Sequence, residues 1–100
     1  MRLGLVTIPR PVAGGPSTAE RLQHIGREAE RLGFAGIWTT DALGRGFPTV
    51  DPLMLLTALA GATSKVELGT CVLQVPLRHP VELAHRVQTL NLLSEGRLRL

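Results

Sequence analysis

Aromatic and cysteine residues are scarce in this sequence. Aromatic side chains make up 3% of the 100 residues, whereas proteins that bind single-stranded nucleic acid rely on exposed rings for base stacking. The 11 Lys and Arg residues are spread along the chain rather than gathered in one run, which is typical of a solvated surface. Cys71 is the only cysteine, which excludes an internal disulfide and a multi-thiolate metal site and fits a reducing compartment.

Long apolar runs and metal-ligand patterns are also missing. The apolar stretch 3–8 stops at Pro9, too short for the core of a signal peptide, and no later run is long enough to span a bilayer. No pair of histidines stands with carboxylates at metal-ligand spacing. We therefore expect a cytoplasmic protein with no bound metal and with neither a membrane nor a nucleic acid as partner.

Short apolar runs alternate with longer segments of helical periodicity. Hydrophobic residues make up 44% of the chain and are mainly Leu, Val, Ile and Ala, which suits helices packed on buried parallel strands. The pattern predicts three helices, which begin near residues 17, 52 and 80 and end near residues 33, 63 and 94. It predicts buried strands at 3–8, 34–38, 66–73 and 97–100.

Local signals mark the starts of the first two helices. Ser17 and Glu20 have the spacing of a capping box, and Gly33 follows the first helix where a left-handed residue is common. Asp51 can cap the second helix, and Pro52 is tolerated at its first position because that amide has no intrahelical partner. The second helix is apolar nearly all round, which predicts that it is covered on both sides.

The elements follow the order βαβαβαβ, without a hairpin between strands. Such alternation implies right-handed crossovers and a parallel sheet with helices outside. An open, doubly wound sheet is the competing architecture, and its dinucleotide-binding form needs a glycine-rich turn directly after the first strand. Gly14 and Gly15 lie too far past that strand and have no third glycine at the right spacing. The pattern therefore favours a (β/α)₈ barrel.

Several segments, in one order and spacing, match a single protein family. They are residues 30–34 with Ile37, Trp38 and Asp41, residues 51–53, residues 62–70, and LGTCVLQVPLRHPVELAHRVQTLNLLSEGRLRL at residues 68–100. Together they resemble the luciferase-like, flavin-dependent monooxygenases. The resemblance implies that residues 1–100 form the N-terminal half of one (β/α)₈ TIM-barrel domain, with parallel strands, outer helices and no second domain.

The same resemblance implies an oxidoreductase that binds FMN at the carboxyl ends of the barrel strands. In such a monooxygenase, reduced FMN and oxygen act on a small organic substrate, and a separate flavin reductase can deliver the reduced flavin. One branch of the family uses a deazaflavin coenzyme for hydride transfer, and some members are non-catalytic flavoprotein subunits. Both remain alternatives. The catalytic acid or base and the phosphate-binding residues are expected beyond Leu100.

The resemblance also implies four cofactor-binding residues. Thr70, Cys71 and Val72 match a segment in which family members have a non-proline cis peptide, here Cys71–Val72, that supports one face of the flavin. The alternative is an ordinary end of a buried strand, with Cys71 as a small hydrophobic residue. Asp41 matches an acid near the edge of the isoalloxazine ring, and the alternative is an aspartate that fixes a loop or caps a helix. A histidine commonly follows this acid in the deazaflavin branch, whereas Ala42 follows it here, which favours FMN.

Four further predictions concern the surface and the chain as a whole. A capping or loop role is favoured for His79, and a surface salt bridge for Arg78. Met54 and its apolar neighbours on the second helix exceed what one barrel wall can cover. Since family members commonly dimerise there, we expect a homodimer through the second and third helices. Residues 1–100 alone are expected to be inactive, because a half barrel leaves two strand edges unpaired.

Overall fold

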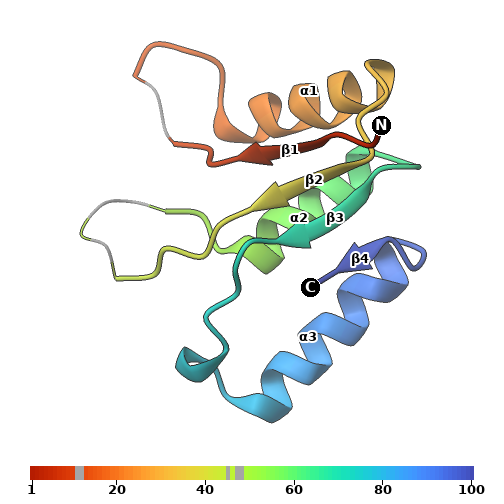
Figure 1. Ribbon diagram of the computed structural model, residues 1–100. Helices are drawn as coiled ribbons and strands as arrows, with labels where there is room; N and C mark the ends of the chain where they lie inside the picture. Colours follow the sequence, from red (N-terminus) through yellow and green to blue (C-terminus); the bar gives the residue numbers. More distant parts are fainter. Residues whose placement is uncertain (11–12, 45, 47–48) are drawn as a thin grey trace.

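Strands and helices alternate along the chain in the computed structural model, which describes residues 1–10, 13–44, 46 and 49–100 (Figure 1). The strands are β1 (Gly4–Thr7), β2 (Gly36–Thr39), β3 (Glu67–Thr70) and β4 (Leu98–Arg99). The helices are α1 (Thr18–Arg31), α2 (Pro52–Ala62) and α3 (Pro80–Leu93), and a 3₁₀ turn at Val75–Leu77 precedes α3. The predicted βαβαβαβ order is therefore confirmed.

The strands form one parallel sheet in the order β1-β2-β3-β4. α1 contacts β2, α2 contacts β3, and α2 lies between α1 and α3 (Figure 1). Ile37 and Leu68 are register partners on adjacent strands and are fully buried. They pack in one core with Leu55, Leu56 and Leu59 of α2. A parallel sheet whose strands are joined through packed helices confirms the fold class predicted for the N-terminal half of a barrel.

The helix starts follow the predicted local chemistry. The Glu20 amide donates to Ser17 Oγ at 3.1 Å, and the Ser17 amide donates to Glu20 Oε2 at 3.0 Å, which completes the capping box. The Met54 amide donates to Asp51 Oδ1 at 3.0 Å at the start of α2. His79 stands at the N-cap of α3, but its side chain makes no capping hydrogen bond. The predicted capping role of His79 is therefore limited to its backbone.

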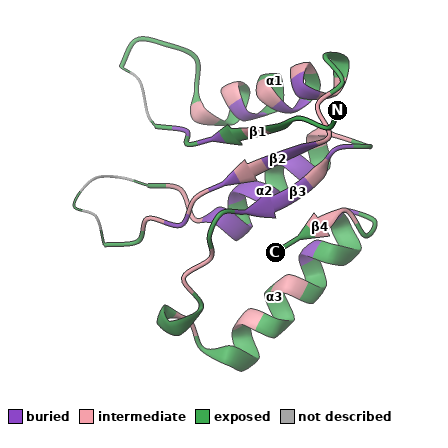
Figure 2. Ribbon diagram, viewed as in Figure 1, coloured by how far each residue is buried: buried purple, intermediate pink, exposed green. Residues whose placement is uncertain are grey.

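The strands are shorter than predicted, and β1 is less buried. β3 ends at Thr70 rather than at residue 73, because the chain leaves the sheet there and enters the 3₁₀ turn. Val6 and Ile8 are 54% and 51% exposed, which contradicts the prediction of a buried first strand. Within the described residues β1 pairs only with β2, and alternate side chains of a strand point to opposite faces. Val6 therefore points away from the core, and β1 is coloured largely as exposed in Figure 2.

Helix α2 is covered on one side only by the described residues. Its buried residues face the sheet and the neighbouring helices, whereas Met54 is 72% exposed and Thr57 and Ala58 are also exposed (Figure 2). The prediction of cover on both sides is thus not met within this part of the chain. The reason is geometric, since β3 and the helices α1 and α3 contact α2 and leave its outer side free.

Trp38 lies across the sheet face opposite the core, over glycine residues. It is the register partner of Gly69 and follows Gly36 by two positions, so all three lie on one face. A Cβ atom on Gly69 would lie 2.1 Å from Trp38 Cζ3, and one on Gly4 would lie 3.0 Å from Trp38 Nε1. Only glycine leaves room for the indole at Gly69.

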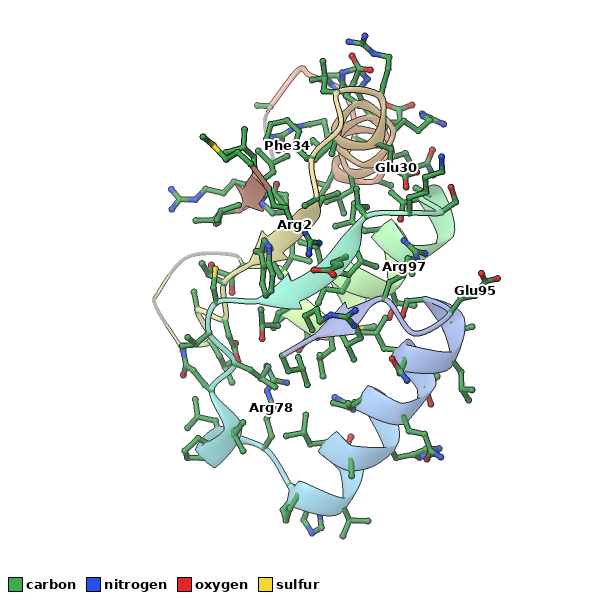
Figure 3. All side chains as sticks on the ribbon, turned by 45° about the vertical axis from the view of Figure 1, so that its right-hand side comes forward. Arg2, Glu30, Phe34, Arg78, Glu95 and Arg97 are labelled. Carbon is green, nitrogen blue, oxygen red and sulfur yellow. The ribbon has the colours of Figure 1, made fainter. Side chains whose placement is uncertain are left out.

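Two charged residues join elements at the amino end of the sheet (Figure 3). Glu30 of α1 accepts hydrogen bonds from the backbone amides of residues 64–66, directly before β3. Arg97 donates to the carbonyl oxygens of Ala60 and Thr63 at 3.2 Å each, and so satisfies the carboxyl end of α2. The Arg97 guanidinium therefore joins the start of β4 to the end of α2.

Candidate functional site

Two connecting segments leave the carboxyl ends of neighbouring strands on the same edge of the sheet (Figure 1). One follows β2 from residue 40 and the other follows β3 from residue 71. The Cys71 amide donates to the Thr39 carbonyl at 2.8 Å, which continues the pairing of β2 and β3 by one residue. Enzymes built on parallel barrels place their active sites at this edge, so it is the candidate site of the chain.

Asp41 ties the segment after β2 to the segment after β3. Its Oδ2 accepts from the Gln74 amide at 2.9 Å and from Arg78 Nη2 at 2.8 Å. Its backbone carbonyl accepts from Gln74 Nε2 at 2.6 Å. The Asp41 side chain is 2% exposed. Its carboxylate is therefore enclosed by its own chain.

The charge of Asp41 is maintained in this enclosed position. Burial by itself raises the pKa of the carboxyl, but hydrogen bonds from the Arg78 guanidinium and from the Gln74 and Leu43 amides together hold the pKa below its ordinary value of 3.8. Asp41 is therefore ionised at neutral pH. Its contribution to folding is present above pH 3.8 and is lost as the pH falls through the lower folded pKa.

Arg78 extends this cluster to the start of α2. Its Nη1 lies 3.3 Å from Asp51 Oδ2, the N-cap carboxylate, while Nη2 binds Asp41. The hydrogen bond to Asp41 raises the pKa of Arg78 against the opposing effect of burial. Arg78 Nε is buried and has no hydrogen-bond partner among the described residues. The sequence predicts a surface salt bridge for Arg78, but the side chain is only 13% exposed (Figure 3).

The four predicted cofactor-binding residues lie close together along this edge, but they differ in exposure. Asp41 and Thr70 are buried, whereas Cys71 and Val72 are exposed, Val72 by 73%. Thr70 follows Leu68 by two positions and lies on the core side of the sheet, so only its backbone faces the edge. The Cys71–Val72 peptide is cis, as predicted. Cys71 directly follows the last residue of β3 and is exposed among the described residues.

The exposed and the enclosed residues of this edge differ in what they can offer a ligand. Val72 is apolar and 73% exposed, and Cys71 beside it is also exposed, so a ligand can contact both. Asp41 offers no open carboxylate oxygen, because its side chain is almost fully enclosed. A separate hollow of about 310 Å³ at the start of α3 is lined by Arg78, His79 and Arg86 but by neither Cys71 nor Val72. That hollow shares Arg78 with the Asp41 cluster but does not include the exposed Cys71–Val72 segment.

Two broader features bear on the choice of ligand. None of the helices in the described part of the chain is long and apolar enough to cross a membrane. Over the same residues, no cluster of three or more His, Cys, Asp or Glu side chains could hold a metal ion.

Known proteins resemble this chain in sequence and in structure. The alkanal monooxygenase alpha chain of Photorhabdus laumondii is 31% identical over 96 residues, which are 95% of this chain and 27% of that protein. The monooxygenase RslO1 from Streptomyces bottropensis superposes with a TM-score of 0.86 and 28% identity, over 100% of this chain and 32% of that one. The coenzyme F420 dependent tetrahydromethanopterin reductase from Methanopyrus kandleri superposes with a TM-score of 0.78 and 27% identity, over 97% of this chain and 25% of that one.

The family assignment rests on the whole chain. This chain spans about a quarter of the length of its curated alkanal monooxygenase relative. A sequence model described as luciferase-like monooxygenase matches residues 1–100, which include every residue of the site. The chain therefore belongs to the luciferase-like monooxygenase family.

Proposed function

We propose that this chain supplies the flavin-supporting edge of a monooxygenase that uses reduced FMN and oxygen on a small organic substrate. The observation that carries the proposal is the exposed Cys71–Val72 segment at the carboxyl ends of β2 and β3, in a chain of this family. When bound, the reduced flavin supplies the electrons for oxygen activation.

Within this proposal, the residues of the chain bind and orient the cofactor. Val72 presents an apolar surface to one face of the ring, and Cys71 and the backbone of Thr70 continue that surface along the edge. Asp41, the fourth residue predicted to bind the cofactor, has an enclosed carboxylate and is not assigned a direct contact with the ring. A separate flavin reductase is the proposed source of reduced FMN, and the cytoplasm is the proposed location.

A deazaflavin-dependent hydride transfer is the second candidate. The similarity to the F420 dependent reductase supports it, with 27% identity over 97% of this chain. Against it, Ala42 follows Asp41 at the position where that branch commonly has a histidine. This favours FMN over the deazaflavin coenzyme.

The cofactor can be identified with the full-length gene product and two matched variants. We expect FMN to bind with micromolar affinity or better and reduced FMN with oxygen to support turnover. Val72→Asp should weaken FMN binding by roughly 10-fold or more, the worth of one buried apolar contact. Val81→Asp on α3 should not, although Val81 is equally exposed at 73%.

Each other outcome of this experiment has a defined meaning. Tight binding of the deazaflavin coenzyme without FMN binding would move the assignment to hydride transfer. FMN binding without turnover would indicate a non-catalytic flavoprotein subunit. Equal effects of the two valine substitutions would show that the Cys71–Val72 segment is not the flavin surface.

A homodimer through α2 and α3 is part of the same proposal. An apolar hollow of about 290 Å³ lies between these helices, lined by residues that include Met54, Leu90 and Leu93. Met54 and Leu93 are 72% and 57% exposed. A second copy that places its own Met54 in this hollow would cover the free side of α2.

A further inference from the structure

We propose that Arg78 and Asp41 are positioning residues, which act on the cofactor by holding the exposed segment Cys71–Leu73 in place rather than by touching the cofactor. This inference rests on the proposed function, in which that segment supports the flavin. It assigns Arg78 a role in the site, and it gives Asp41 a different task from a direct contact.

The segment Cys71–Leu73 is fastened at both of its ends. On one side, the Cys71 amide donates to the Thr39 carbonyl at 2.8 Å. On the other side, Gln74 makes two hydrogen bonds to Asp41, through its amide at 2.9 Å and through its side chain at 2.6 Å. Both anchors belong to β2 or to the residues directly after it, so the position of the segment depends on where Asp41 is held.

Arg78 holds Asp41 in that position. Its two terminal nitrogens reach Asp41 at 2.8 Å and Asp51 at 3.3 Å, and Asp51 is itself fixed as the N-cap of α2. A guanidinium presents its donors in a rigid fork, which lets one side chain join two carboxylates that belong to different segments. The carboxylate of Asp41 is thereby fixed relative to a helix that is part of the core.

The exposures separate positioning from direct contact. The Asp41 and Arg78 side chains are 2% and 13% exposed, whereas Val72 is 73% exposed. A ligand at this edge meets Val72 and Cys71 first. The effect of Asp41 and Arg78 on the ligand must therefore pass through the backbone between Cys71 and Gln74.

Hydrogen exchange of the flavin-free, full-length protein tests whether Arg78 and Asp41 hold the segment Cys71–Leu73 in place. Arg78→Met should speed exchange of the hydrogen-bonded amides of Cys71, Gln74 and Val75 by roughly 10-fold or more, the worth of one hydrogen bond to a charged group, and leave the amides of the strands unchanged. Arg86→Met is the matched control, since Arg86 lines the same hollow as Arg78 but is exposed and pairs with Glu82. Unchanged exchange of the Gln74 amide in Arg78→Met would overturn the proposal.

FMN titration of the same variants tests whether the position of the segment Cys71–Leu73 affects the affinity for FMN. Arg78→Met should weaken FMN binding by roughly 10-fold, Arg78→Lys should restore part of it by retaining the charge, and Arg86→Met should bind as the unaltered protein does. If residues 71–75 exchange faster in Arg78→Met while FMN affinity stays the same, the segment does not position the flavin and the proposal is wrong.

Two further outcomes keep the inference separate from the proposed function. If the unaltered protein binds no flavin, the proposed function fails, and the role of these residues toward a cofactor fails with it, whatever hydrogen exchange shows. If Arg78→Met does not fold, Gln74→Ala removes only the side-chain bond to the Asp41 carbonyl. That variant should then loosen the same segment, and unchanged exchange and affinity in it would overturn the proposal.

Discussion

At the scale of single residues, Trp38 and Gly69 depend on each other. The indole covers the sheet face that would otherwise carry a Gly69 side chain, and a Cβ there would also lie 2.6 Å from the Arg99 carbonyl. Neither the backbone of β4 nor the ring can move away without disturbing the sheet. The requirement for glycine at this position comes from packing rather than from backbone conformation.

Gly69→Ala is therefore expected to destabilise the full-length protein by about 1–3 kcal/mol, the usual cost of overpacking. Gly61→Ala is the control, because Gly61 lies in α2 with nothing within 4 Å of an added Cβ. Alanine in an exposed helix position should raise stability by about 0.5–1 kcal/mol. Urea unfolding of both variants provides the measurement, and equal shifts in the two midpoints would contradict the packing argument.

Glu30 provides a second test at this scale, through the dependence of stability on pH. Burial by itself raises the pKa of its carboxyl, but hydrogen bonds from the amides of Ser64, Lys65 and Val66 together hold it below the ordinary value of 4.5. A lowered folded pKa means that the stabilisation is present above pH 4.5 and is lost as the pH falls through the folded value.

Glu30→Gln should thus lower stability at neutral pH and flatten the loss of stability below pH 4.5. Glu28→Gln serves as the control, since Glu28 is exposed and makes its ion pair with Arg31 of the same helix, where solvent screens the charges. Urea midpoints measured from pH 3 to pH 7 would compare the pH dependence of stability in the two variants and in the unaltered protein. A profile of Glu30→Gln parallel to that of the unaltered protein would show that the three amide contacts carry no net stabilisation.

At the scale of elements, α2 and α3 leave an apolar side without cover. The hollow between them has a largely apolar lining, in which Met54 and Leu93 are exposed, and its polar members are Asp51, Thr57, His85, Arg86 and Thr89. Apolar surface of this kind on a helix pair is typical of a protein interface. The proposed homodimer would bury it against the same surface of a second copy.

Met54→Lys should therefore convert a dimeric full-length protein into monomers, because a buried lysine without a partner is costly at an apolar interface. Gln23→Lys on the exposed side of α1 adds the same charge away from this surface and should leave the mass unchanged. Sedimentation velocity distinguishes the two results, and an unaltered dimer mass for Met54→Lys would count against the interface.

The same scale shows why some elements are easier to predict than others. The capping box at Ser17 and Glu20 and the Asp51-Pro52 start lie within four residues of sequence, and the structure confirms both. The ends of the strands were predicted less well, since a strand ends where its neighbour stops pairing with it. Apolar residues continue past Thr70 to Leu73, but the pairing with β2 ends at the hydrogen bond of the Cys71 amide.

At the scale of the whole molecule, the described sheet has two outer strands, β1 and β4, that each pair on one side only, and one face without cover. β1 pairs only with β2 and β4 only with β3 among the described residues, and Val6 and Ile8 are half exposed. Unpaired edges beside exposed apolar side chains favour association between chains. The face that carries Trp38 lacks a facing layer within this part of the chain.

Residues 1–100 expressed alone should therefore self-associate and should not turn over FMN. The full-length gene product should turn over FMN. Exposing a few apolar side chains costs roughly 1.5–3 kcal/mol each, which is comparable with the total stability of about 5–15 kcal/mol of a typical domain. Light scattering, thermal unfolding and an FMN turnover assay would test this. A monomeric chain with cooperative unfolding and FMN turnover would refute it.

The order of the elements, the starts of α1 and α2, the family and the location of the candidate site could all be predicted from the amino-acid sequence. These features depend on residues that are close in sequence or on motifs of fixed spacing, so local chemistry is sufficient to predict them. The tertiary structure alone decided which residues of the site are enclosed and which are open. Arg78 reaches Asp41 across 37 positions and Asp51 across 27, and Arg97 reaches the end of α2 across 34. Such contacts form only after the sheet and helices have packed, and burial is a property of that packing rather than of residue type.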